Sequence, residues 1–297
     1  MSKKFIRRSL LYTPGSSMKM LTKAKTATAD AIIMDLEDAV SVGEKDTARE
    51  NVAALIDEMK ATGKEVIVRV NAMDTGWGIR DIMAIVPGRP DAVIVPKADK
   101  KALTVADYLL SAMEYECAIP LNTIKMIPLF ETTYAITNAY EVLGAAERID
   151  GVQLGAEDLT KEQEIERTMM GAEISYARHQ LAFSARARGL DIIDTPYTGI
   201  KDLEGLRTDA INAKNIGFTG KTCIHPSHAD VLNAVFSPSA EAVEYAKGVV
   251  EALDQAIAEG KGAVMYMGKM IDAPIADRSR RIIEKAERIS KLKSELK

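Results

Sequence analysis

Charged side chains end most of the short apolar runs in this sequence. If those runs are parallel strands of an α/β barrel, their carboxyl ends meet in one bowl, where such barrels hold their active sites. One acid at a strand end is more often a salt bridge or a helix cap, but recurrence in most runs favours a site. The residues concerned are Asp35, Glu37, Asp38, Arg69, Asn71, Lys97, Glu131, Glu157, Asp158, Asp194, Lys221 and His225.

Two of these acids, Glu131 and Asp158, follow neighbouring runs and suit a magnesium ion. Mg²⁺ prefers one or two carboxylates, completed by water and substrate oxygens. A zinc site is not expected, because the chain has three histidines, two cysteines and no cluster of them. Arg69 offers a planar pair of donors for a substrate carboxylate or a developing oxyanion. We therefore expect a metal-bound 2-oxo or 2-hydroxy acid, beside which a carbon–carbon bond is made or broken.

Lys97 raises a different chemistry, that of an aldolase that forms a Schiff base with its substrate. Such a lysine must be desolvated, so that its pKa falls. Acids at the neighbouring strand ends favour the charged ammonium, and we rank this alternative low. A phosphate-binding turn is only weakly indicated, by Gly15 and Gly155, because no GxGxxG or P-loop sequence is present.

Eight apolar runs rich in β-branched residues alternate with segments of helical periodicity, which is typical of parallel βα units. The sequence thus predicts an α/β fold, a (β/α)8 TIM barrel over residues 1–236 with a C-terminal helical extension over residues 237–297. An open, doubly wound sheet is the alternative. The extension should hold helices at 240–259 and 278–296 around an apolar segment at 262–275, and we expect it to pack on a neighbouring subunit. The expected strands are residues 9–14, 31–38, 65–71, 92–98, 125–131, 151–158, 190–195 and 216–224.

Composition excludes several other classes of protein. The 297 residues are 47% hydrophobic and 28% charged, which is ordinary for a globular chain. A net charge of -4 argues against a nucleic-acid partner, since phosphate backbones are bound by clustered Lys and Arg. The apolar run after the basic start ends at Pro14, too short for a signal peptide or a membrane span. Two cysteines without a short spacing fit a reducing, cytoplasmic setting.

Several motifs in their order along the chain resemble a known family. The chain is similar to the citrate lyase beta subunit and the malyl-CoA and citramalyl-CoA lyases, within the HpcH/HpaI-type aldolases. The resemblance implies a barrel, Mg²⁺, thioester substrates and a homotrimer or hexamer, with other lyase subunits as further partners. The matching motifs are residues 7–15 (RRSLLYTPG), 33–40 (IMDLEDAV), 68–71 (VRVN), 95–97 (VPK), 154–158 (LGAED) and 268–274 (GKMIDAP).

The same resemblance implies roles for individual residues. Glu131 and Asp158 would take the metal, and Arg69 would bind the carboxylate and keto oxygen of the oxo acid. Asp272 would act as acid or base from a neighbouring subunit, and Arg8 would face the CoA or carrier arm. Strand eight ends in His225-Pro226, a form also typical of the CoA-dependent lyases, so CoA and a protein-bound carrier both stay open.

The expected activity is therefore a Mg²⁺-dependent lyase acting on a 3-hydroxy-acyl thioester. It would give an oxo acid such as oxaloacetate, glyoxylate or pyruvate plus an acetyl thioester, or run in reverse. Malyl-CoA or citramalyl-CoA cleavage is an alternative, as is a thioesterase or malate-synthase-like outcome after the same step. A non-catalytic subunit of a larger complex is the alternative from another class, and it should show no metal-dependent binding of oxaloacetate.

Overall fold

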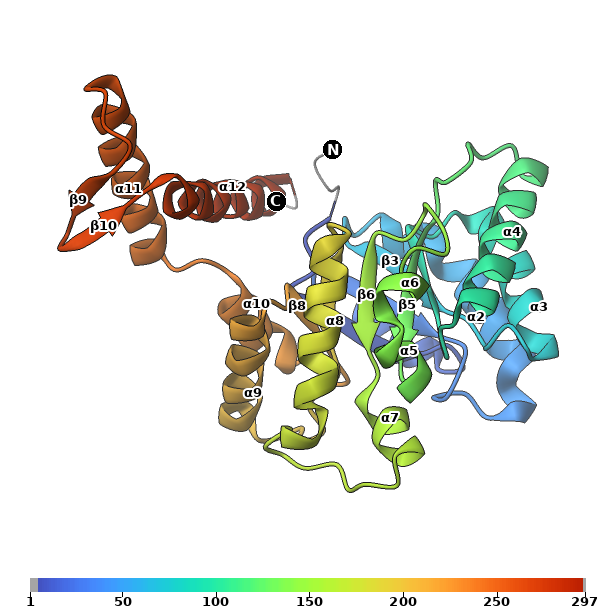
Figure 1. The fold of residues 1–297 in the computed structure, drawn as a ribbon. Helices are drawn as coiled ribbons and strands as arrows, with labels where there is room; N and C mark the ends of the chain where they lie inside the picture. The colour runs from blue at the N-terminus through green and yellow to red at the C-terminus, as the bar shows by residue number, and fades with distance from the viewer. Residues whose placement is uncertain (1–4, 296–297) are drawn as a thin grey trace. The chain divides into compact units, whose positions relative to one another are not determined.

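Eight parallel strands close into a barrel in the computed structural model, which describes residues 5–295 and, for 293–295, the backbone alone (Figure 1). Each strand pairs in parallel with the next along the chain, and β1 pairs with β8. This confirms the (β/α)8 prediction and removes the open sheet. The strands are β1 Ser9–Pro14, β2 Ala31–Asp35, β3 Glu65–Arg69, β4 Ala92–Val95, β5 Lys125–Phe130, β6 Gly151–Leu154, β7 Asp191–Asp194 and β8 Gly220–Cys223.

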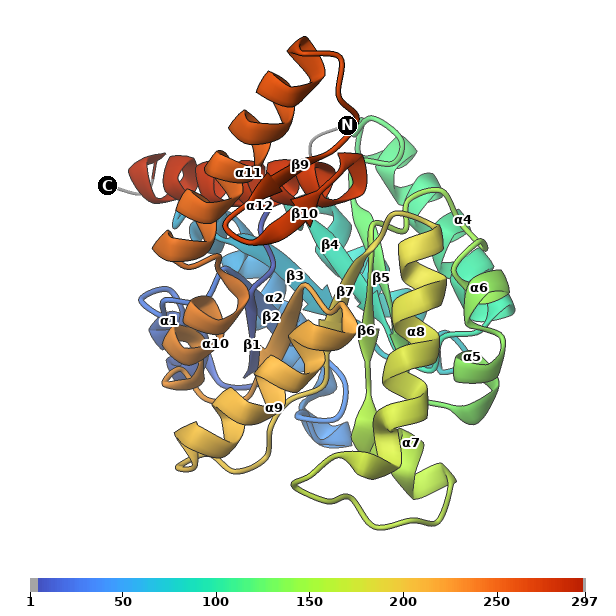
Figure 2. The same ribbon diagram turned by 60° about the vertical axis from the view of Figure 1, so that its left-hand side comes forward.

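Helices follow the strands and surround the barrel (Figures 1 and 2). Several begin at a side chain that accepts a hydrogen bond from the backbone of the first turn, as at Ser17, Thr75, Asp99, Thr132 and Asp202. The helices are α1 Met18–Ala24, α2 Lys45–Lys60, α3 Gly76–Ile85, α4 Lys100–Glu116, α5 Thr133–Thr137, α6 Ala139–Val142, α7 Ala156–Glu162, α8 Ser175–Ala187, α9 Leu203–Ile216 and α10 His228–Phe236, with short 3₁₀ turns at Val42–Glu44, Val86–Gly88 and Ala172–Ile174.

The alternation of side chains along each strand decides what fills the barrel. Successive side chains of a strand point to opposite faces. The buried cluster of the interior takes Leu10, Ile33, Ile67 and Leu129, each from a different strand. Two residues further along each of these strands, the same inward face carries a polar side chain at the carboxyl end. These inward residues are Tyr12, Asp35, Arg69 and Glu131.

Several strands are shorter in the structure than expected, and the sixth is the one that changes the site. The sixth strand ends at Leu154, and Gly155 is the N-cap of α7, so Asp158 lies in the first turn of a helix and not on a strand. Acidic residues in a first turn are stabilised by the helix dipole, which explains why a helix begins here. After β5, two short helices, α5 and α6, meet at Asn138. None of the described helices is both long and apolar enough to cross a lipid bilayer.

The C-terminal residues form a compact unit of their own. The chain divides into Arg7–Ala234 and a second unit of residues 235–295 with residues 5 and 6, whereas we had expected the boundary after residue 236. The second unit contains α11 Ala240–Ala258, an antiparallel hairpin of β9 Val264–Tyr266 and β10 Lys269–Ile271, and α12 Ala273–Glu295 (Figure 2). Its small core holds Val249, Leu253, Ile271 and Ala276. The helix expected from 278 begins earlier, at Ala273, and residue 296 lies outside the described residues.

Candidate active site at the mouth of the barrel

A cavity of about 380 Å³ opens at the carboxyl ends of the barrel strands. Arg69, Glu131 and Asp158, which the sequence singled out, all line it. Acidic residues outnumber basic ones around it, because Arg69 is the one basic residue among those that line it. The other lining residues include Tyr12, Asp35, Asp38, Leu129, Gln153, Gly155, Ala156, Glu157, Thr195, Pro196 and Ile224.

Glu131 follows β5 and is 4% exposed. The backbone N–H of Lys97 donates to its Oε1 at 2.7 Å. Burial raises the pKa of Glu131 to about 7, with a further rise from the negative charge of Asp158, although the Lys97 N–H opposes the shift. A buried carboxylate beside a second acid is a group that a divalent cation would stabilise.

Asp158 is half-buried and stands in the first turn of α7. A hydrogen bond holds that turn against the end of β7, because the backbone N–H of Ala156 donates to the hydroxyl oxygen of Thr195, the residue after β7, at 3.2 Å. Among residues 5–295 no three His, Cys, Asp or Glu side chains converge as a metal cage. Glu131 and Asp158 line one cavity, and two carboxylates completed by water and substrate oxygens suit Mg²⁺.

Arg69 is held by neighbouring carboxylates. Its Nε and Nη2 donate to the two oxygens of Asp35, each at 2.7 Å. Its Nη1 lies 3.0 Å from Glu37 Oε2 and 3.3 Å from Asp38 Oδ2, and the guanidinium stacks 4.9 Å from the centre of the Tyr12 ring. The two-donor fork expected for substrate thus binds Asp35, and Nη1 and the second N–H of Nη2 are left for an incoming anion.

Glu37 is 7% exposed and stands against Arg69 in the turn after β2. Burial raises the pKa of Glu37 to about 8, and the charges of Asp38 and Glu131 add to the rise, while Arg69 lowers it. The turn is fixed by the buried Lys45, whose Nζ donates to the carbonyls of Leu36 and Glu37, each at 2.7 Å.

Tyr12 and Gln153 were not singled out from the sequence. The Gln153 amide donates to the Tyr12 hydroxyl at 2.9 Å, and both residues line the cavity. Burial raises the pKa of Tyr12, so the phenol stays protonated. A signal was present in the sequence, since Gln153 is a polar residue inside an apolar run and Tyr12 has the same parity as the inward Leu10.

Arg8, which was expected to face the CoA or carrier arm, does not lie at this mouth. Arg8 precedes β1, so it lies at the amino ends of the strands, on the opposite face of the barrel from the cavity. There its guanidinium pairs with Asp30, which precedes β2, at 2.6 Å. Parallel strands all run the same way, and a residue before a strand therefore cannot reach the bowl.

Asp194 and Lys221 were also expected in the bowl, and the structure places them on the outside of the barrel wall. Asp194 follows the inward Ile193, so strand alternation turns it towards the helices. Lys221 Nζ lies 2.5 Å from Asp194 and 2.6 Å from Asp209, and Arg178 completes this buried network at 2.8 Å from Asp194. The network fastens α8 and α9 to the barrel.

Asp272 belongs to the C-terminal unit, and the cavity within residues 7–234 is lined without it. It caps α12, because its Oδ1 accepts a hydrogen bond from the backbone N–H of Ile275 at 3.3 Å. The side chain is half-buried. The adjoining hairpin exposes three methionines, Met265, Met267 and Met270, each more than 60% accessible.

Known proteins resemble this chain over most of its length. The model of the HpcH/HpaI aldolase/citrate lyase family matches residues 8–226. The citrate lyase subunit beta of Escherichia coli K12 is 37% identical, over 95% of this chain and 93% of that protein. A (3S)-malyl-CoA thioesterase of Cereibacter sphaeroides is 36% identical, over 95% of each chain.

Among solved structures, the protein CitE of Mycobacterium tuberculosis was crystallised with magnesium, acetoacetate and coenzyme A. It superposes with a TM-score of 0.76 at 28% identity, over 95% of this chain and 98% of that one. Together with the eight-stranded barrel and the acidic cavity at its mouth, these similarities show that the chain belongs to the HpcH/HpaI aldolase/citrate lyase family.

Proposed function

We propose that this chain is a Mg²⁺-dependent lyase that cleaves a 3-hydroxy-acyl thioester into an oxo acid and an acetyl thioester, or catalyses the reverse condensation. The observation that carries the proposal is the meeting of Arg69, Glu131 and Asp158 in one cavity at the carboxyl ends of the strands. The magnesium and the oxo-acid anion bound by the CitE relative fit the same chemistry.

Glu131 and Asp158 would hold Mg²⁺, and the bound ion would supply Lewis-acid stabilisation of the charge that develops on the oxo acid. Arg69 supplies the positive charge that the acidic mouth otherwise lacks. Its Nη1 lies near both Glu37 and Asp38, and its hydrogen bond to Asp38 can pass to an incoming carboxylate, because the Asp38 side chain is 66% exposed and can turn into water. Asp35 keeps the guanidinium plane fixed while this exchange takes place.

In the cleavage direction the substrate hydroxyl gives its proton to water, and the bond between that carbon and the α-carbon of the thioester breaks. The hydroxyl carbon becomes a keto group, and the α-carbon keeps the electron pair and takes up a proton. We assign this proton to Asp272 or to a water that it orients. Acid or base help of this kind contributes about 10² to 10⁴ in rate.

Asp272 would come from a neighbouring subunit of a homotrimer or hexamer. Three exposed methionines on its hairpin support this, because apolar surface of that kind suits an interface between subunits. The test mixes Asp272→Ala with Glu131→Gln protein under conditions of subunit exchange. Each alone should be nearly inactive, and mixed oligomers should regain activity; no recovery despite exchange would place Asp272 in cis or outside the mechanism.

Magnesium binding tests the core of the proposal. Titration of wild-type protein with Mg²⁺ and oxaloacetate should show metal-dependent binding, and Glu131→Gln or Asp158→Asn should abolish it. Glu157→Gln is the matched control, because Glu157 lines the same cavity but is 59% exposed and pairs with Arg167. Normal binding by Glu131→Gln would contradict the metal assignment, and absence of binding in the wild type would favour a non-catalytic subunit.

The thioester itself is identified by an assay of citryl-, malyl- and citramalyl-CoA. The similarity to a malyl-CoA thioesterase supports a second outcome, in which the thioester is hydrolysed. A lyase releases an acyl thioester and no free thiol, whereas hydrolysis releases free CoA, so a thiol reagent separates the two. If no CoA ester reacts, a protein-bound carrier and further lyase subunits become the expected partners.

The free Cys117 and Cys223 support a reducing, cytoplasmic location.

A further inference from the structure

Lys97 has a left-handed backbone conformation, with φ of 48°. Residues with a Cβ avoid this region, which glycine adopts freely and asparagine tolerates. Among the described residues that are not glycine, Lys97 alone combines positive φ with a position two residues after a barrel strand and an amide bonded to a cavity carboxylate. The other described residues of positive φ are Arg89, Ala118, Asn122, Glu164 and Met267.

The left-handed turn directs one backbone N–H at the proposed metal ligand. The amide of Lys97 donates to Glu131 Oε1 at 2.7 Å. The next amide, of Ala98, returns to the sheet and donates to the carbonyl of Leu129 on β5 at 3.2 Å. Because of the left-handed turn, the Lys97 N–H leaves the β4–β5 hydrogen bonding and donates to the Glu131 side chain instead.

Glu131 is confined from its other side by Gly155. A Cβ at Gly155 would lie 2.8 Å from the Glu131 Cβ and 3.0 Å from Oε2, closer than such atoms approach. Oε1 is thus fixed by the Lys97 amide, and Oε2 lies where only a glycine leaves room. The two neighbours together set the orientation of the carboxylate.

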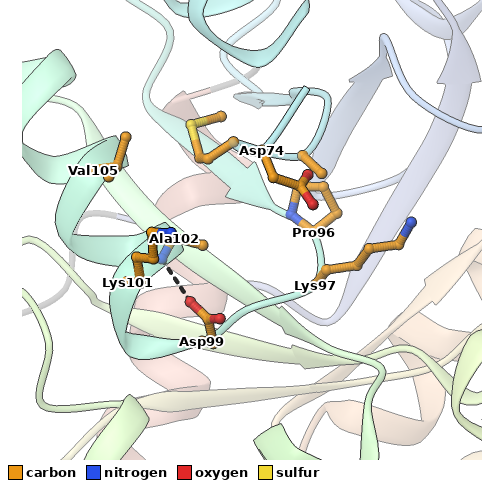
Figure 3. Close-up of a pocket in the computed structure, with 9 residues that line it drawn as sticks. Asp74, Pro96, Lys97, Asp99, Lys101, Ala102 and Val105 are labelled. Carbon is orange, nitrogen blue, oxygen red and sulfur yellow. Dashed lines mark hydrogen bonds between the residues drawn. The ribbon is translucent and has the colours of Figure 1, made fainter. Parts of the chain in front are cut away.

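The side chain of Lys97 takes no part in this arrangement. It is exposed, and its ammonium has no hydrogen-bond or ion-pair partner among residues 5–295. Figure 3 shows it extending away from Asp74 and Asp99, which together with Lys97 line a second cavity of about 310 Å³. A Schiff-base lysine needs a desolvated ammonium, which an exposed side chain does not provide.

We propose that Lys97 is a positioning residue for Glu131, and that its backbone rather than its ammonium does this. The left-handed turn holds the carboxylate in the orientation that binds the metal. The inference rests on the proposed function in one respect, namely that Glu131 is a metal ligand.

The test compares four substitutions at this position by the affinity for Mg²⁺ in the presence of oxaloacetate, measured by calorimetry. Lys97→Gly and Lys97→Asn accept positive φ and should bind Mg²⁺ within about twofold of wild type. Lys97→Val disfavours the left-handed turn and should weaken Mg²⁺ binding about 10- to 100-fold, the range seen when a partner that orients a metal ligand is lost. The Mg²⁺ affinity of Lys97→Ala should lie between these values. If Lys97→Val does not fold, the inference is tested by whether the glycine and asparagine variants bind Mg²⁺ more tightly than the alanine variant.

Arg89 provides the matched control, because it flanks the same strand at its other end. It is exposed, has φ of 55°, and precedes β4, so it lies at the other end of the barrel. Arg89→Val should lower the Tm without metal about as much as Lys97→Val, yet leave Mg²⁺ affinity unchanged. A loss of Mg²⁺ affinity in Arg89→Val would attribute the effect to general destabilisation and overturn the inference.

Two results at position 97 would also overturn it. Equal losses in the glycine and asparagine variants would assign the role to the ammonium, and normal Mg²⁺ binding by a folded Lys97→Val would remove the role of the turn. Glu131→Gln separates these from failure of the proposed function. If Glu131→Gln binds Mg²⁺ normally, the metal assignment fails. If Glu131→Gln loses Mg²⁺ binding while every Lys97 variant binds Mg²⁺ normally, only the positioning inference fails.

Discussion

Replacement of Glu131 by glutamine should stabilise the metal-free protein at alkaline pH while abolishing Mg²⁺ binding. The folded-state pKa of Glu131, about 7, lies above its ordinary value of 4.5 because the carboxyl group is buried. A group with a raised folded-state pKa contributes stability that is complete below about pH 4.5 and is lost as pH rises through 7. Glutamine has the same shape and never acquires the charge.

The shift of about 2.5 units corresponds to about 3 kcal/mol at 1.36 kcal/mol per unit. Glutamine Oε1 keeps the hydrogen bond from the Lys97 amide, but the new NH₂ group lacks a partner beside Gly155, which costs about 1 kcal/mol. The net gain above pH 8 is therefore about 2 kcal/mol. In a domain of this size that raises Tm by about 4 to 8 °C.

The assay is thermal unfolding of both proteins in EDTA at pH 5.5 and pH 8.5. The Tm of Glu131→Gln should exceed that of the wild type at pH 8.5, and the two should differ little at pH 5.5. Glu37, whose pKa is about 8, titrates in both proteins, and loss of the Glu131 charge lowers the pKa of Glu37, which adds to the gain of the variant at pH 8.5. A variant that is less stable at pH 8.5, or a difference independent of pH, would refute the argument from burial.

Three further predictions follow from the contacts of single side chains. Arg69→Lys should lower kcat/KM at least about 100-fold, nearly as much as Arg69→Ala, because lysine cannot reproduce the two hydrogen bonds to Asp35. Near-normal turnover in a coupled oxaloacetate assay would contradict this. Lys45→Met should lower kcat about tenfold at nearly unchanged Mg²⁺ affinity, because the turn after β2 loses its anchor; equal loss of both would indicate general damage. Arg148→Met should lower the free energy of unfolding in urea by about 3 kcal/mol, because it leaves the fully buried Glu114 without its cation; a change below about 1 kcal/mol would disprove it.

The barrel and the main site residues could be predicted from the sequence because they depend on local patterns. Eight apolar runs alternating with amphipathic helices specify parallel βα units, and a polar residue ending such a run is directed to the barrel mouth. Arg69 and Glu131 were placed correctly in this way. Asp158 was brought to the same cavity although it lies on α7 and not on a strand, because the helix begins directly at the end of β6.

The sequence alone could not decide the partners of these residues, since partners come from distant parts of the chain. The fork of Arg69 binds Asp35, 34 residues away, because β2 and β3 are neighbours and both residues face inward. Asp194 ends a strand as Glu131 follows one, yet strand alternation turns it outwards to Lys221. The left-handed turn at Lys97 depends on the same closure of the barrel, which brings a backbone N–H of one strand end within 2.7 Å of the carboxylate that follows the next.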